Sequence, residues 1–111
     1  MKKNNLSEFT GGWFLGDFSP SLIPMQNFEV GVKYFEKGQT EPEHYQLTAT
    51  EYTVIISGEC RIGKYLLSSG DILTIPPLES ADFEALSKTS LVVVKTPSIP
   101  EDKVLGKYNV A

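Results

Sequence analysis

Residues 38–76, GQTEPEHYQLTATEYTVIISGECRIGKYLLSSGDILTIP, decide the fold of this chain. The run at 52–56 is rich in β-branched and aromatic residues and stops at Ser57-Gly58. Such runs are typical of strands, because these side chains pack well on a pleated surface. Two further runs flank Gly63-Lys64, which predicts a tight hairpin, and 72–75 is a strand that ends at Pro76-Pro77. We therefore predict several short strands joined by turns.

The strand pattern continues on both sides of this stretch. Upstream, every second residue from Phe28 to Tyr34 is apolar, which predicts a strand whose buried face carries these residues. A break is expected over 38–42. Downstream, strands are predicted over 83–86 and 91–95, and the second of these is so apolar that we expect both its faces to be buried. No helix longer than a turn or two is indicated, so the pattern predicts an all-β barrel or sandwich.

The composition bounds the size and the partners of the protein. A chain of 111 residues with 41% hydrophobic content suits one domain with one core. The net charge of −4 gives no attraction to a polyanion, so nucleic acid is not expected as a partner. No apolar run approaches the roughly 20 residues of a membrane-spanning helix, so a membrane is not expected either.

The cysteine content and the first residues bear on the compartment. Cys60 is the single cysteine, which rules out an internal disulfide. Met1-Lys2-Lys3 is followed by a polar, acidic segment instead of the apolar stretch of a secretory signal. Both observations predict a cytoplasmic protein.

One set of intervals carries a family resemblance. Gly38, His44, Gln46, Glu51 and Gly58 have the spacing of the first sequence motif of the cupin superfamily. Gln46 stands where a second histidine usually occurs.

A second set of intervals follows. Gly70 to Pro76 resembles the start of the second cupin motif, but Leu78 stands where a glycine is common, and Ala81 occupies the place of the last metal-binding histidine. Glu79, Ser80 and Asp82 lie close to this position, and Glu79 is our choice among them for a substitute ligand.

The resemblance implies a jelly-roll barrel, the double-stranded β-helix of RmlC-like cupins, with a core of about residues 28–95. It also implies a homodimer. Residues 1–27 form an N-terminal aromatic arm around Trp13, which covers part of the sheet in its own chain or in a neighbouring subunit. Residues 97–111 form a tail that wraps the surface or frays. The whole chain, 1–111, is then a single domain.

The resemblance also implies a ligand set with reduced metal affinity. Residues i and i+2 of a strand share a face, so His44 and Gln46 enter the barrel together and Glu51 joins them from the next strand. The family's metal ligands would then be His44, Gln46 and Glu51, with Ala81 leaving the fourth position vacant. Because a carboxamide is a weak ligand for first-row ions, we expect one divalent transition metal at low affinity, or none.

The leading functional hypothesis is a protein that binds a small molecule, a sugar or a carboxylate, in a pocket around His44, Gln46 and Glu51. Tyr34 is a further candidate for the pocket wall. Pockets of this kind combine apolar walls with a few polar groups.

Three alternatives remain open. A metal-dependent dioxygenase-like or isomerase-like enzyme would use His44, Gln46 and Glu51 as ligands, and His44 and Glu51 are the candidate catalytic residues. A metal-free sugar-nucleotide epimerase or ketoisomerase would use His44 as base and Tyr34 or Tyr52 as proton donor. A non-catalytic dimeric interaction module would instead have a filled barrel interior.

Overall fold

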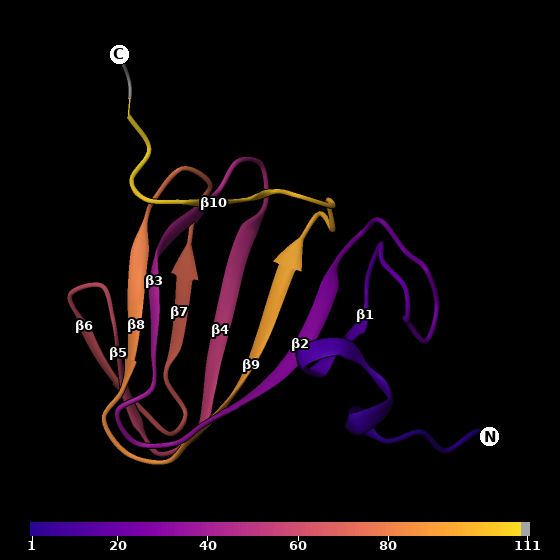
Figure 1. Ribbon diagram of the computed structural model, residues 1–111, viewed down its shortest axis with the longest axis horizontal. Coiled ribbons are helices and arrows are strands. Elements are labelled where there is room, and N and C mark those ends of the chain that lie inside the picture. Colours follow the sequence, from indigo (N-terminus) through magenta and orange to yellow (C-terminus); the bar gives the residue numbers. More distant parts are fainter. Residues whose placement is uncertain (110–111) are drawn as a thin grey trace.

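Two five-stranded sheets lie face to face in the computed structural model, which describes residues 1–109 (Figure 1). The first sheet has the strand order β1-β2-β9-β4-β7 and the second the order β10-β3-β8-β5-β6. All paired strands within these sheets run antiparallel, as in a jelly roll. The strands are β1 (Trp13–Leu15), β2 (Glu29–Phe35), β3 (Thr40–Gln46), β4 (Thr50–Ser57), β5 (Glu59–Ile62), β6 (Tyr65–Ser68), β7 (Ile72–Ile75), β8 (Ala81–Ala85), β9 (Thr89–Thr96) and β10 (Lys103–Leu105).

Most predicted strands are present, with shifted ends. The hairpin at Gly63-Lys64 is confirmed as β5–β6, and 72–75 is confirmed as β7. The break expected over 38–42 is shorter than predicted, because β3 already begins at Thr40 and runs through Pro42. The helical elements are two short 3-10 turns, η1 (Leu6–Glu8) and η2 (Thr10–Gly12), and no helix in residues 1–109 has the length and apolarity to cross a bilayer.

Gly58 of the first motif has a steric role at the junction of β4 and β5. Its φ is +84°, a conformation that residues with a side chain rarely adopt. A Cβ at this position would also collide with the carbonyl oxygen of Lys88. The motif glycine is therefore required by the fold.

The hydrophobic core occupies part of the space between the sheets. Ile55, Leu91 and Val93 come from the first sheet, and Cys60 and Phe83 come from the second. Cys60 is fully buried and unpaired, and burial raises the pKa of its thiol. The thiol is therefore a packing group and not a reactive one.

The orientation of β2 is opposite to the prediction. Lys33 and Phe35 point into the barrel and Gly31 is buried, whereas Tyr34 is 68% exposed on the outer face. The prediction for β9 was also only partly correct. Both faces were expected to be buried, but Val92 on the outer face is only half-buried. The alternation was correct, but the apolar positions of β2 face outward and the barrel interior accepts charged side chains.

The outer surface of the first sheet is consequently apolar. Val30, Val94 and Tyr52 form one row across β2, β9 and β4, and Val32, Val92, Val54 and Ile72 form the next row, which extends to β7. We call these seven residues the outer apolar face. No charged residue occurs in either row.

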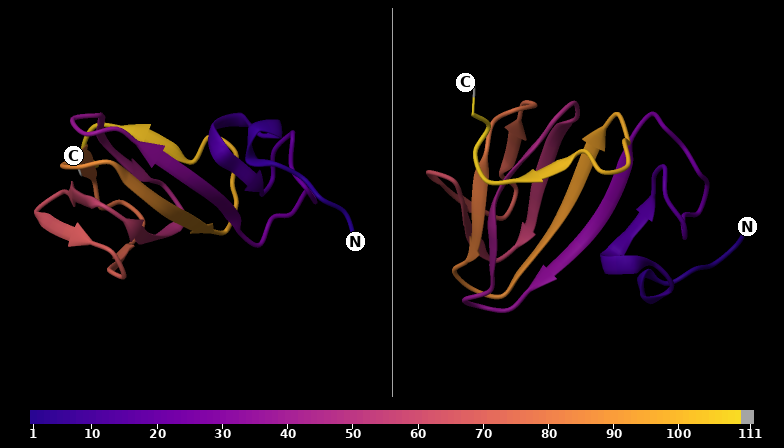
Figure 2. Two further views of the ribbon diagram at one scale, coloured as in Figure 1. Left: turned by 90° about the horizontal axis from the view of Figure 1, so that it is seen from below. Right: turned by 45° about the horizontal axis from the view of Figure 1, so that its top comes forward.

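Both terminal segments pack against the barrel of their own chain. Trp13 of β1 pairs with Gly31 of β2, so the N-terminal arm extends the first sheet. The tail forms β10, which pairs with β3 and crosses the end of the barrel (Figure 2). The tail was expected to wrap the surface or to fray, and within the described residues its strand β10 pairs with β3, whereas residues 110–111 lie outside the described residues.

Candidate functional site

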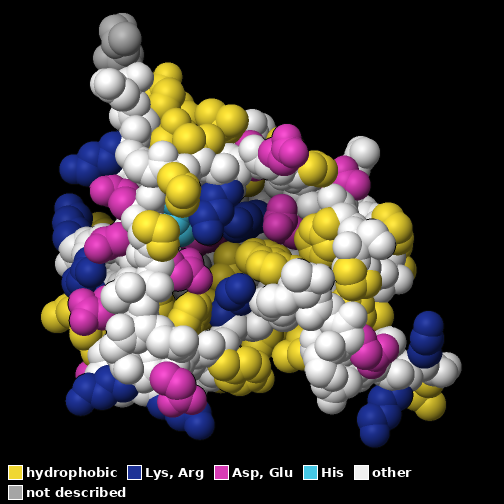
Figure 3. Space-filling model, in the orientation of Figure 1, with side chains coloured by type: hydrophobic (Ala, Val, Ile, Leu, Met, Phe, Trp, Pro, Cys, Tyr) yellow, Lys and Arg dark blue, Asp and Glu magenta, His cyan; other side chains and the backbone are white. Residues whose placement is uncertain are grey.

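A cavity of about 230 Å³ lies between the two sheets. In the space-filling view, acidic, basic and apolar side chains surround a hollow on the face toward the viewer (Figure 3). Its apolar wall comes from core residues such as Phe83, Leu91 and Val93, and its polar wall from residues of both sheets. The interaction-module hypothesis required a filled interior, and this cavity does not meet that requirement.

His44 lines the cavity from β3. Its Nδ1 lies 3.0 Å from the carbonyl oxygen of Pro42, so in the neutral ring Nδ1 carries the proton and donates it. Nε2 is then the basic nitrogen. The pairing of β3 with β8 is irregular between Glu41 and His44, and this irregularity brings both side chains to the cavity although they are three residues apart.

Gln46 lines the cavity two residues further along β3, as the i and i+2 spacing predicts. Its residue is only 4% exposed, yet its Nε2 has no hydrogen-bond partner. A buried polar atom without a partner costs about 1–3 kcal/mol. The Gln46 side-chain N–H groups therefore lack an acceptor within the protein, and a ligand could supply one.

Glu51 reaches the cavity from β4, in the opposite sheet. Its Oε2 accepts a hydrogen bond of 3.1 Å from the hydroxyl of Thr53. Within residues 1–109, His44 forms no ion pair with Glu51 at 4.0 Å or less. The three predicted residues thus line one cavity from two sides, with space between the imidazole and the carboxylate.

The tyrosines considered at the sequence level lie elsewhere. Tyr34 and Tyr52 are 68% and 39% exposed, and neither lines the cavity. Ala81, in contrast, lies directly opposite His44 on β8 and does line it. Glu79, the candidate substitute ligand, lines it as well.

The donor set does not fit a tight metal centre. In the part of the chain that the structure describes, no three His, Cys, Asp or Glu side chains are grouped closely enough to hold an ion. One imidazole, one carboxylate and one carboxamide remain, and the carboxamide is a weak donor for first-row metals. We therefore derive no chemical step through a metal.

Trp13 is a cavity residue that the sequence did not place. Its indole lies over Gly31, where a Cβ would come within 2.7 Å of two ring atoms. The ammonium of Lys95 lies 5.0 Å from the ring centroid and that of Lys33 lies 5.8 Å from it.

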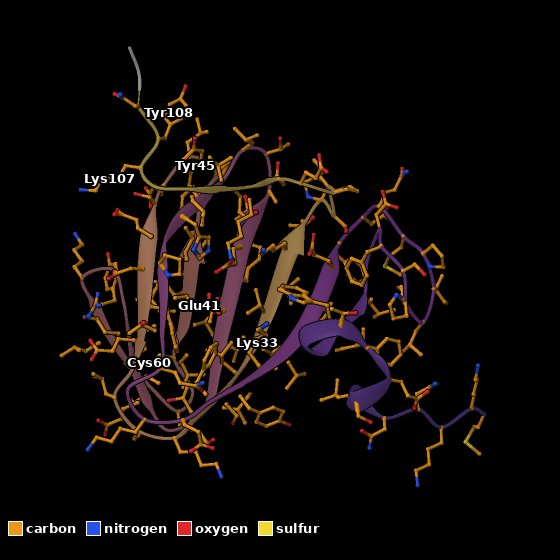
Figure 4. The ribbon with its side chains drawn as sticks, viewed as in Figure 1. Lys33, Glu41, Tyr45, Cys60, Lys107 and Tyr108 are labelled. Atoms are coloured by element: carbon orange, nitrogen blue, oxygen red, sulfur yellow. The ribbon has the colours of Figure 1, made fainter. Side chains whose placement is uncertain are left out.

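Lys33 of β2 and Glu41 of β3 come from opposite sheets and both line the cavity (Figure 4).

The tail adds Lys103, which sequence reasoning also missed. Lys103 is paired with Gln46 across β10 and β3 and lines the cavity. The preceding residue, Asp102, is 7% exposed and anchors this segment, because its carboxylate accepts hydrogen bonds from the backbone N–H groups of Thr48 and Ala49 at 2.9–3.2 Å. No local sequence signal marks the hydrogen bonds of Asp102, since more than fifty residues separate it from Thr48 and Ala49.

Glu29, Lys95 and Glu51 form a charged row on the inner face of the first sheet. They are direct cross-strand neighbours on β2, β9 and β4. Burial raises the pKa of the Glu29 carboxyl above its ordinary value, and the nearby Lys95 ammonium and the Ser98 hydroxyl oppose this shift. The row places acceptors and a donor side by side at the cavity wall.

Comparison with known proteins identifies the fold. No protein-family model matches the chain, and no curated protein matches its sequence. The structure is similar to an uncharacterised conserved protein with a double-stranded beta-helix domain from Klebsiella pneumoniae, with a TM-score of 0.72 and 18% identity over 96% of this chain and 93% of that protein.

Two solved structures with assigned activities are also similar. A sugar phosphate isomerase from a cupin superfamily, from Silicibacter pomeroyi, has a TM-score of 0.59 and 20% identity over 65% of this chain and 52% of that protein. Oxalate decarboxylase from Bacillus subtilis has a TM-score of 0.64 and 15% identity over 72% of this chain and 24% of that protein. The chain therefore has the double-stranded β-helix fold of the cupins, as the motif spacing predicted.

Proposed function

We propose that this small cupin binds a small molecule in the cavity around His44, Gln46 and Glu51. The observation that carries the proposal is the buried, unpartnered Nε2 of Gln46 at the wall of a hollow barrel. A ligand that accepts a hydrogen bond from this atom would recover the cost of its burial. An apolar wall with a few polar groups is the usual composition of such sites.

We propose that the ligand is either a sugar or a small carboxylate. Both offer oxygen acceptors to Gln46, and sugar hydroxyls can donate to Glu51 or to the Nε2 of neutral His44. The cupin neighbours are described as acting on a sugar phosphate and on oxalate, which fits these two classes. A divalent metal at low affinity is an optional occupant of the same three side chains.

Titration calorimetry on the wild type and on His44→Ala tests the proposal. Panels of neutral sugars and small carboxylates should give binding heats with the wild type, and His44→Ala should weaken binding by about tenfold for each lost hydrogen bond of about 1.4 kcal/mol. Leu66→Ala on β6, 74% exposed and outside the cavity, is the matched control. The proposal is wrong if His44→Ala binds every compound as the wild type does.

We also propose that the protein acts as a cytoplasmic homodimer that associates through the outer apolar face. Exposed apolar rows of this kind mark interaction surfaces. A second copy carries the same net charge of −4, and the outer apolar face adds no like-charge repulsion at the contact because neither of its rows contains a charged residue. The unpaired Cys60 suits the reducing cytoplasm.

Light scattering after size-exclusion chromatography measures this association. Val92→Glu places a charge in the centre of the outer apolar face and should give a monomer, whereas Leu66→Glu on the second sheet should leave the dimer intact. A wild type that runs as a monomer at micromolar concentration contradicts the proposal.

A further inference from the structure

Three lysines line the cavity without ion-pair partners. Within residues 1–109, Lys33, Lys95 and Lys103 have no carboxylate oxygen at 4.0 Å or less, and the ion pairs present there involve Arg61 and Lys88. Lys33 is satisfied in another way, because its Nζ donates to the carbonyl oxygen of Gly11 at 3.0 Å. Lys95 and Lys103 are the cations available to a ligand.

Lys95 is half-buried and forms no close ion pair with its acidic neighbours. It lies directly across from Glu29 on one side and Glu51 on the other, yet its ammonium group lies over the Trp13 ring. A contact with an aromatic face is weaker than a close ion pair, so the ammonium keeps most of its capacity for an anion.

The positions of Lys95, Lys103 and Gln46 define one polar junction. These three residues and Glu29 line the main cavity and also a second, smaller hollow beneath the tail. The acids Asp17, Glu101 and Asp102 line only that second hollow. The junction therefore contains two ammonium groups and an amide N–H without a partner. Within residues 1–109, neither Glu29 in the junction nor Glu51 across from Lys95 forms an ion pair with these lysines at 4.0 Å or less, so both ammonium groups are available to a ligand carboxylate.

From this junction we infer that the ligand is a small hydroxylated carboxylic acid whose carboxylate is held by Gln46, Lys95 and Lys103. The inference rests on the proposed binding function and selects within its two ligand classes. The hydroxyl groups of the ligand face the carboxylates of Glu41 and Glu51, which accept hydrogen bonds. A volume of about 230 Å³ is below the roughly 300–1,000 Å³ of sites for drug-sized molecules, so the ligand is of monosaccharide size or smaller.

The fluorescence of Trp13, the single tryptophan, provides the assay because the indole lines the cavity. The probes are D-glucuronate, D-glucose, which lacks the carboxylate, and acetate, which lacks the hydroxyls. Wild-type protein should bind glucuronate about tenfold or more tightly than either other probe. Lys95→Met and Lys103→Met should each weaken glucuronate binding by about tenfold or more and leave glucose unchanged, while Lys64→Met in the β5–β6 hairpin should change neither.

Gln46→Met supplies a second readout. It removes the unpartnered amide at similar size, so the unliganded protein should melt at an equal or higher temperature while glucuronate binding falls. If glucose binds as tightly as glucuronate, or if the lysine variants weaken both equally, the carboxylate inference is wrong and the binding function stands. If no probe changes the fluorescence or gives a calorimetric heat, both are wrong.

Discussion

Replacing Asp102 with alanine tests how firmly the tail is held over the cavity. The carboxylate accepts hydrogen bonds from two backbone N–H groups, those of Thr48 and Ala49, and the residue is 7% exposed. A hydrogen bond to a charged group contributes about 1.5–3 kcal/mol. Removing the Asp102 carboxylate leaves both N–H groups without their acceptor and should lower the free energy of unfolding by about 3 kcal/mol. At about 4 °C per kcal/mol, the melting temperature should fall by about 12 °C.

Thermal unfolding by circular dichroism measures this loss, and Asp71→Ala is the matched control. Asp71 also accepts a backbone N–H, that of Ser68 at 2.8 Å, but in an exposed turn where water replaces it. The control should lose about 1 kcal/mol or less. Since Lys103 adjoins Asp102, ligand binding should weaken in Asp102→Ala and not in Asp71→Ala. The reasoning is refuted if the two variants melt within about 2 °C of each other.

Three further predictions concern the cavity wall. Gly31→Ala should destabilise the fold by about 1–3 kcal/mol because its Cβ overlaps the indole, and Trp13→Leu in the same chain should restore part of the loss in a denaturant titration. Glu29→Gln should raise the melting temperature at pH 7.5: burial raises the folded-state pKa of Glu29, so its charge destabilises the fold above that pKa, and the advantage should vanish below the ordinary value of 4.5. An equal or lower melting temperature at pH 7.5 would contradict this sign. Ala81→His should place a second imidazole opposite His44 and tighten Ni²⁺ binding at least tenfold in calorimetry, and an unchanged affinity would show that the two positions do not converge.

The residue pattern predicted most strand positions, and the motif spacing singled out three candidate residues that line one cavity. His44 and Gln46 share a face by simple alternation, and Glu51 follows on the next strand. Gly58 was identified as a turn, and its positive φ and close approach to Lys88 explain why no side chain is tolerated there. Residue types and their spacing along the chain were therefore sufficient to predict these features.

The orientation of β2 could not be predicted by the rule that apolar residues face inward. That rule assumes a filled interior and a solvated exterior. Here the interior contains a hollow that accepts Lys33, and the exterior carries the outer apolar face, so the apolar alternation placed Tyr34 on the wrong side. The arm around Trp13 was expected to cover the sheet, but the places of Trp13 and Lys103 at the cavity were not predicted, because pairings between distant segments leave no periodic signal in the sequence.

The contact between Trp13 and Gly31 has a consequence for how this sequence can change over time. The indole occupies the volume that a side chain on residue 31 would need. Neither position can be replaced freely while the other stays as it is, although eighteen positions separate them in the chain. In chains descended from a common ancestor, a larger residue at position 31 should therefore occur together with a smaller one at position 13, and the two substitutions should be inherited as a pair.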